Sequence, residues 1–116
     1  RGKGSVAGVR NSLAQLRTES NLYINDNGNF GTAVAANCSS ANTVFANAKF
    51  TSIRQAAETT AGYSAVCVNS ITGLGAWALS IQTRPDGTGN TFLCTDSTGK
   101  IKAYASAPSI AGAVCP

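Results

Sequence analysis

The sequence predicts an α+β fold, with a long N-terminal helix packed across a four-stranded antiparallel meander sheet. Three observations lead to this prediction. Apolar residues recur at helical spacing near the N-terminus, the period changes to two from Tyr63 onward, and short turn clusters separate the alternating stretches. A chain of 116 residues has the length of one domain, so we assign residues 1–116 to a single globular unit.

The first predicted element is a helix over residues 5–27. Its stripe is spaced by three or four residues throughout and consists of Val6, Val9, Leu13, Leu16, Ser20 and Tyr23. The run Asp26-Asn27-Gly28 follows the stripe, and Asn or Gly readily adopts the left-handed conformation that ends a helix. About 20 helical residues extend roughly 30 Å, which is the length of a small domain.

Residues 28–60 are expected to form a variable loop followed by a short helix. The stretch 29–43 is rich in Asn, Ser, Gly and Ala, which is typical of a loop. A second helical stripe then consists of Ala46, Phe50, Ile53 and Ala57. We expect residues 60–62 to end this second helix.

Residues 61–105 are expected to form the sheet. Apolar and polar residues alternate in four short stretches, at 63–68, 77–82, 92–95 and 100–105. Turn-forming residues fill the gaps between these stretches, so consecutive strands are expected to pair. The last segment, 106–116, contains Pro108 and Gly112 and is predicted to be a C-terminal loop.

The four cysteines are Cys38, Cys67, Cys94 and Cys115, and no two of them lie closer than 21 residues. Zinc sites usually take ligands in close pairs, so this spacing favours two disulfides. Three pairings are possible. We prefer Cys94–Cys115, which would attach the C-terminal loop to the sheet, together with Cys38–Cys67. Disulfides indicate an oxidising compartment.

Composition excludes two kinds of feature. The chain has no His, so it has no histidine metal ligand and no histidine general base. It has no run of about 18 apolar residues, so this sequence contains no membrane-spanning helix. The net charge of +4 comes from scattered basic residues. A basic protein can attract nucleic acid, and the residues that would contact DNA are Arg84, Lys100 and Lys102. A mildly basic soluble surface is the simpler interpretation.

No residue pattern predicts catalysis, a cofactor or a metal centre. Asp86 and Asp96 flank the third predicted strand, but both lie in turn sequences, where Asp usually binds nearby backbone N–H groups. Residues 86–90 place oxygens at alternate positions but lack the Gly and the distal Glu of an EF-hand calcium loop. Asn37 begins an Asn-Cys-Ser glycosylation sequon. We therefore expect a protein that is not an enzyme.

Several segments resemble the type IV pilin superfamily. Residues 9–18 (VRNSLAQLRT) look like the exposed half of a pilin spine helix, and residues 23–30 (YINDNGNF) look like a frequent helix exit of that family. Residues 77–80 (WALS) and 92–100 (FLCTDSTGK) are similar to paired strands of small bacterial pilins. The order of these segments, over nearly the whole chain, is more specific than any one of them.

The resemblance implies a mechanical role as a structural subunit, with the main pilin favoured. The subunit would polymerise with other copies into a surface pilus for adhesion, motility or DNA uptake. The helix face Val6, Val9, Leu13, Leu16 and Tyr23 would pack both on the sheet and along the filament interior. The partners would be other pilin subunits, the pilus assembly machinery and the prepilin peptidase, and the final location would be extracellular.

The very hydrophobic first half-helix of the family is missing from this sequence. We expect it to precede the chain in the native protein, where it would hold the subunit in the inner membrane before assembly. Its removal would also explain why the chain begins at Arg1 rather than at Met. The alternatives are a pseudopilin of a type II secretion system, a DNA-binding minor pilin, and an unrelated small secreted module with disulfides, such as an enzyme or an inhibitor.

Overall fold

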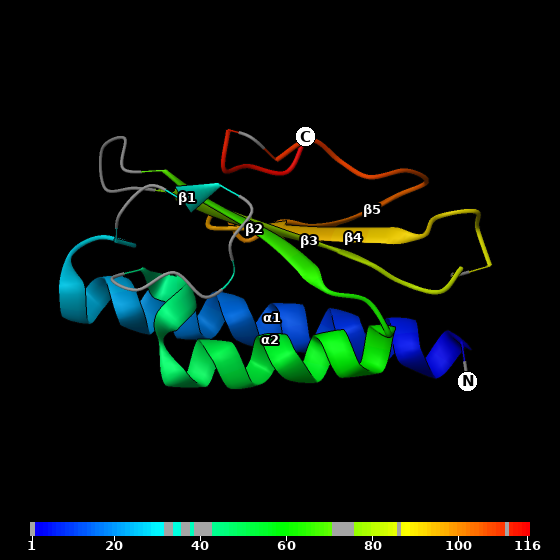
Figure 1. Ribbon diagram of the computed structural model, residues 1–116, viewed down its shortest axis with the longest axis horizontal. Helices are drawn as coiled ribbons and strands as arrows, with labels where there is room; N and C mark the ends of the chain where they lie inside the picture. The colour runs from blue at the N-terminus through cyan, green and yellow to red at the C-terminus, as the bar shows by residue number, and fades with distance from the viewer. Residues whose placement is uncertain are drawn as a thin grey trace.

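The N-terminal helix sets the length of the molecule. In the computed structural model, α1 (Gly2–Asn27) has 26 residues, so at 1.5 Å per residue it extends about 39 Å. The longest dimension of the whole chain is also 39 Å. Figure 1 shows α1 running along the full length of the fold. The structure describes residues 2–31, 34–35, 38, 43–70, 76–85, 87–110 and 112–116.

The remaining elements follow the predicted order, with one strand added. They are β1 (Val34–Ala35), the 3₁₀ turn η1 (Val44–Ala46), α2 (Ala48–Ala61), β2 (Ala65–Ser70), β3 (Ala76–Gln82), β4 (Phe92–Asp96) and β5 (Ile101–Tyr104). The four predicted strands correspond to β2 to β5. The long helix begins at Gly2 rather than at residue 5, although Gly2 and Gly4 have low helix propensity.

The sheet is an antiparallel meander in the order β1-β2-β3-β4-β5. The prediction of four strands was therefore incomplete, because β1 lies within the stretch 29–43 that was predicted to be a loop. Val34 and Ala35 pair with Asn69 and Val68 at the free edge of β2. A strand of two residues is too short to show an alternating pattern, so the pairing could not be recognised from the sequence.

α2 lies beside α1 on the same face of the sheet (Figure 1). Asn47 caps its start, since its side-chain oxygen accepts hydrogen bonds from the N–H groups of Lys49 and Phe50. Gly62, in the left-handed conformation at φ 84°, ends it as predicted. The two helices approach closely where Gly8 faces Thr60, since an added Cβ on Gly8 would lie 3.3 Å from the Thr60 methyl carbon.

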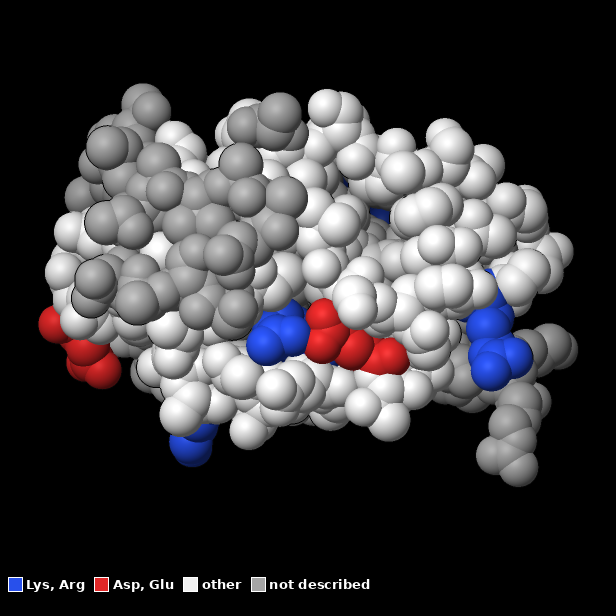
Figure 2. All heavy atoms as spheres, viewed as in Figure 1, with Lys and Arg blue, Asp and Glu red and all other residues white. Residues whose placement is uncertain are grey.

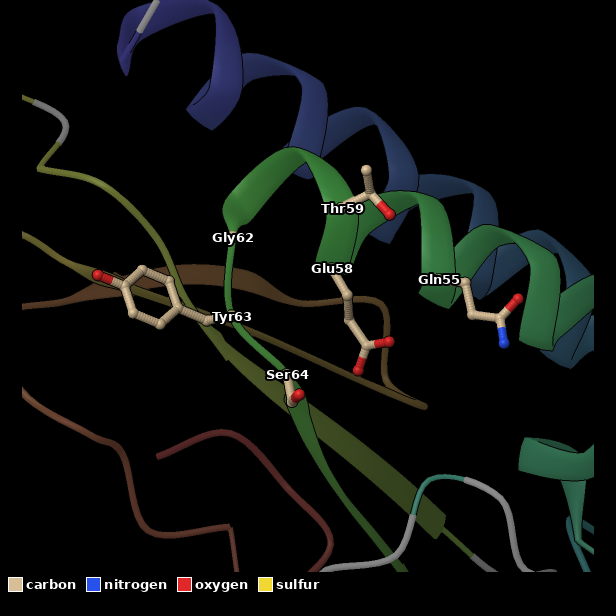
Figure 3. Close-up of a pocket in the computed structure, with 6 residues that line it drawn as sticks. All are labelled: Gln55, Glu58, Thr59, Gly62, Tyr63 and Ser64. Carbon is tan, nitrogen blue, oxygen red and sulfur yellow. The ribbon is translucent and has the colours of Figure 1, made fainter.

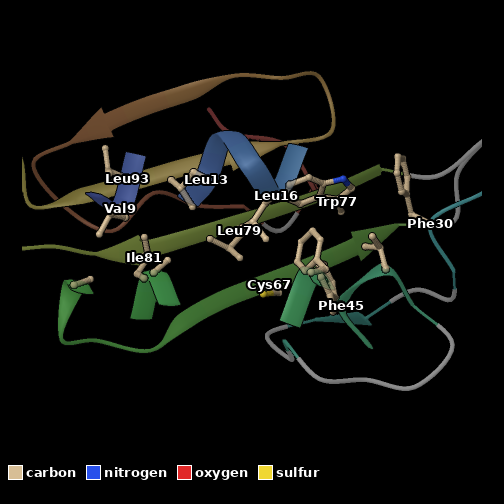
Figure 4. Packing of buried hydrophobic residues seen from close by; sticks show 14 of the residues in the cluster. Val9, Leu13, Leu16, Phe30, Phe45, Cys67, Trp77, Leu79, Ile81 and Leu93 are labelled. Atoms are coloured by element: carbon tan, nitrogen blue, oxygen red, sulfur yellow. The ribbon is translucent and has the colours of Figure 1, made fainter. Parts of the chain in front are cut away.

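The main core fills the space between the helix pair and the inner face of the sheet. Val9, Leu13 and Leu16 of α1 are fully buried there. Figure 4 shows these three side chains beside those of the central strands. Trp77 of β3 packs edge-on against Phe50 and Phe45, with ring centroids 5.3 and 6.5 Å away. The long helix therefore lies across one face of the sheet, as predicted.

The C-terminal segment forms a third layer on the outer face of the sheet. Ile110, Ala113 and Cys115 bury a smaller cluster with Val68 and Ala78. Disulfides join Cys94 to Cys115 and Cys38 to Cys67, which is the pairing preferred from the sequence. The first attaches the C-terminal loop to β4, and the second attaches the segment before α2 to β2.

The burial of α1 gives a direct stability test with two leucines of the same helix. Leu13 is fully buried and Leu22 is 52% exposed. We expect Leu13→Ala to lower the free energy of unfolding by about 2–5 kcal/mol, since it opens a cavity under the sheet. Leu22→Ala removes the same atoms at the surface and should change the free energy of unfolding by less than about 0.5 kcal/mol. Urea unfolding measures both, and equal losses would contradict the packing of α1.

Candidate functional site

A hollow between the end of α2 and the start of β2 is lined by Gln55, Glu58, Thr59, Gly62, Tyr63 and Ser64. Figure 3 shows that these side chains do not converge on one point, since the Tyr63 ring and the Gln55 amide extend in opposite directions. Glu58 is already engaged. One carboxylate oxygen lies 2.6 Å from the Arg54 Nη1, and the other accepts a hydrogen bond from the Ala65 N–H at 2.8 Å. Glu58 thus joins α2 to β2.

A second hollow lies between the two helices, with Gln15, Glu19, Lys49 and Ser52 among its lining residues. It is open to solvent and holds one acidic and one basic side chain on opposite helices. In the view of Figure 2, the described residues are mostly uncharged, with one place over α2 where acidic and basic side chains touch. The Arg54–Glu58 pair lies on that helix.

The carboxylate of Asp96, at the end of β4, accepts several hydrogen bonds. Asp96 is fully buried. Its Oδ1 accepts hydrogen bonds from the Thr98 N–H and hydroxyl, and its Oδ2 accepts one from the Cys115 N–H at 2.8 Å. One side chain therefore shapes the β4–β5 turn and holds the C-terminal loop, beside the Cys94–Cys115 disulfide.

Hydrogen bonds determine the charge state of Asp96. Burial raises the pKa of this carboxyl, but the bonds from the Thr98 hydroxyl and from the backbone of Cys115, Thr98 and Lys100 together outweigh it and lower the pKa below its ordinary 3.8. The carboxylate is thus ionised at neutral pH, when it can accept all of these bonds.

Two further side chains attach the last residue to β5. The Tyr104 hydroxyl donates to the Pro116 carbonyl oxygen at 2.8 Å, and the Lys102 Nζ donates to the same oxygen at 3.0 Å. Burial, followed by the charge of Asp96, raises the pKa of the Tyr104 phenol above 10.0, so it stays protonated and able to donate. We call Asp96, Tyr104, Lys102 and the Cys94–Cys115 disulfide the C-terminal latch.

The sequence did not reveal this latch in full. Asp96 was predicted to bind nearby backbone groups, and its bonds to Thr98 confirm that prediction. Its bond to Cys115 joins residues 19 positions apart, which no local pattern encodes. The local signal for the latch was Asp96 itself, which ends a strand and is followed by Ser-Thr-Gly.

The structure separates the three basic residues predicted to contact DNA. Arg84 is exposed after β3, at the end of the sheet where β4 begins, whereas Lys100 follows β4 at its other end. The five residues of β4 extend about 15 Å between them. Lys102 is also exposed, but its ammonium group belongs to the latch. The three therefore do not form one site.

The helix face predicted to pack on the sheet does so. Val6 is 7% exposed, and Val9, Leu13 and Leu16 are fully buried, with Tyr23 partly buried against them. In this structure they belong to the subunit's own core. The candidate residues Asp86 and Asn37 lie outside the described residues.

Within the described ranges, no cluster of three or more His, Cys, Asp or Glu side chains has the arrangement of a metal site. Over the same ranges, no helix is long and apolar enough to cross a membrane. Compared with protein-family models, with curated proteins and with solved structures, the chain matches none of them.

The lowered pKa of Asp96 predicts how stability depends on pH. Because the folded pKa lies below the unfolded value near 3.8, this carboxylate contributes its full stabilisation above about pH 4 and loses it as the pH falls through the folded pKa. Asp96→Asn leaves the Cys115 N–H without its carboxylate acceptor, so we expect it to cost about 2–3 kcal/mol at pH 7.

Urea unfolding at pH 7 and at pH 3 measures both effects. The wild-type protein should lose stability between these two pH values, and the Asp96→Asn protein should lose less. Glu19→Gln, which removes a carboxylate from the surface of α1, serves as the control and should follow the wild type. An Asp96→Asn protein with the full wild-type pH dependence would show that Asp96 is not the titrating group.

Proposed function

We propose that the chain is the globular domain of a structural subunit of a bacterial type IV pilus. The observation that carries this proposal is the arrangement of α1. The helix extends along the whole molecule, and one side of it is buried under the subunit's own sheet. The opposite side is exposed and presents small or uncharged residues, Ala7, Asn11, Ala14, Thr18 and Asn25. These five lie within a sector of about 60°, at 100° per residue.

A filament subunit needs a surface of this kind. Helices pack closely where side chains are small, and a long helix with a small, uncharged face suits repeated contacts between identical copies. In this proposal the exposed side of α1 faces the filament interior and the buried stripe holds the globular domain on the helix. The filament contact is thus assigned to residues other than the predicted stripe.

The outer parts of the domain are consistent with exposure outside the cell. Two disulfides attach the segment before α2 and the C-terminal loop to the sheet. Such bonds form and persist in oxidising surroundings. The apolar half-helix, the prepilin peptidase and the assembly machinery enter this proposal through the resemblance to pilins, as does the main-subunit role.

The composition of native filaments tests the proposal. Filaments sheared from cells of the source organism should contain this sequence, and its chain there should carry roughly 20 or more additional apolar residues before Arg1, enough for a membrane-spanning helix. Mass spectrometry and N-terminal sequencing measure this. A native chain that is secreted free, with no such extension and no filament, would reject the pilus proposal and favour a small secreted module. A short periplasmic structure in its place would favour a pseudopilin.

Two matched substitutions test the assigned contact face. Ala14 on α1 and Ala56 on α2 are both exposed alanines in helices. We expect Ala14→Trp to abolish filaments seen by electron microscopy, since the bulky ring separates neighbouring copies. Ala56→Trp makes the same change away from this face and should leave filaments intact. Both purified domains should keep the wild-type melting temperature, and normal filaments with Ala14→Trp would show that α1 does not form the contact.

A further inference from the structure

The structure brings together three cations that the sequence leaves far apart. Arg10 and Arg17 are seven residues apart on α1, so they lie on the same flank of the helix about 10.5 Å from each other. That flank faces β5, because α1 contacts β4 and β5 and Arg17 lies against the β4–β5 turn. Lys100 is exposed in the same turn. We call Arg10, Arg17 and Lys100 the basic rim.

Gly99 creates the space in which Arg17 lies. Its φ is +91°, in the left-handed region that favours glycine, and an atom at its Cβ position would be 2.7 Å from the Arg17 Nε and 2.8 Å from its Cζ. The guanidinium group thus lies directly over a residue without a side chain. Lys100 is the next residue along the chain, so two cations of the rim meet at one turn.

The acidic residues of the described chain do not neutralise the rim. Glu58 is paired with Arg54, and Asp96 is buried and accepts hydrogen bonds from the β4–β5 turn and Cys115. Glu19 lies on the other flank of α1, where it lines the hollow with Lys49. Asp26 is seven residues farther along the same helix, so it lies on that other flank too. Among the described residues, the Arg54–Glu58 contact is the one salt bridge, so the cations of the rim have no ion-pair partner there.

From this arrangement we propose that the basic rim binds the phosphate backbone of double-stranded DNA. Guanidinium groups match the geometry of phosphate oxygens, and two of the three cations are Arg. Duplex DNA carries one charge per ~1.7 Å of its axis. A polymer of such high charge density gives three cations the largest binding free energy, since counterions are released when they neutralise phosphates.

The rim lacks the features of single-strand or base-specific binding. Single-stranded nucleic acid is usually held by aromatic side chains that stack on the bases, and no aromatic residue belongs to the rim. Tyr63 is 44% exposed, but it precedes β2, and β3 and β4 separate β2 from β5. The contact is therefore to the backbone and independent of base sequence. This inference goes beyond the proposed pilus function and does not depend on polymerisation.

Fluorescence anisotropy with a labelled duplex of about 30 base pairs tests the proposal on the purified chain. Three phosphate contacts predict a slope of about −2.7 for the logarithm of the binding constant against the logarithm of salt concentration, which is an affinity loss of about 40-fold between 50 and 200 mM. Arg17→Gln and Lys100→Gln should each reduce the magnitude of the slope by about 0.9. Arg17→Lys keeps the charge and should keep the slope.

Arg84→Gln is the matched control, because Arg84 is exposed but lies at the opposite end of β4. It should leave both affinity and slope unchanged. An Arg84→Gln effect as large as that of Arg17→Gln would mean that net charge alone, and not the rim, attracts the DNA. A slope near zero, or tighter binding of a sulfated polysaccharide than of the duplex, would also overturn the proposal. Because the assay uses free subunits, its outcome is separate from that of the filament tests.

Discussion

The whole fold depends on the burial of one helical stripe. Val9, Leu13 and Leu16 are fully buried between α1 and the sheet, and α1 is as long as the molecule. With a burial term of about 25 cal/mol per Å² of apolar surface, side chains of this size each contribute about 2 kcal/mol. α2 then completes the helical layer by packing on α1, and the two helices approach closely where Gly8 faces Thr60. The inner face of the sheet is thus closed by two helices.

The outer face is closed by a different kind of interaction. The segment 106–116 has only two large aliphatic side chains, Ile110 and Val114. Val114 is 40% exposed, so the buried cluster of this segment is small. A covalent bond, Cys94–Cys115, and a buried carboxylate, Asp96, hold it instead. Asp96 is ionised because the hydrogen bonds it accepts outweigh the effect of burial on its pKa. Polar and covalent contacts therefore hold the cover of the outer face in place, whereas apolar packing of the helices covers the inner face.

The helices and the four longer strands could be predicted from the sequence, because local periodicity encodes them. Features that arise from tertiary contacts could not. Helical spacing at Val6 to Leu16 and alternation from Tyr63 onward are local signals, and they predicted both helices and four strands. β1 has two residues and exists only because the edge of β2 offers hydrogen-bonding partners. The bond from Cys115 to Asp96, the position of Arg17 over Gly99 and the distance of Arg84 from Lys100 all depend on how distant elements pack. The paired cysteines and the core face of α1 were predicted from the sequence, whereas the separation of Arg84 from Lys100 depends on the fold.

Three sides of α1 have different chemistry, and the fold explains why they stay separate. Val9, Leu13 and Leu16 of the stripe are fully buried in the subunit's core. The flank toward β5 carries Arg10 and Arg17, where the sheet ends and solvent keeps the cations hydrated. The side that faces away from the sheet carries Ala7, Ala14 and Thr18, with no charge between them. A helix that contacts copies through its uncharged side would leave its basic flank accessible, so a filament built in this way would present a row of basic rims at regular intervals.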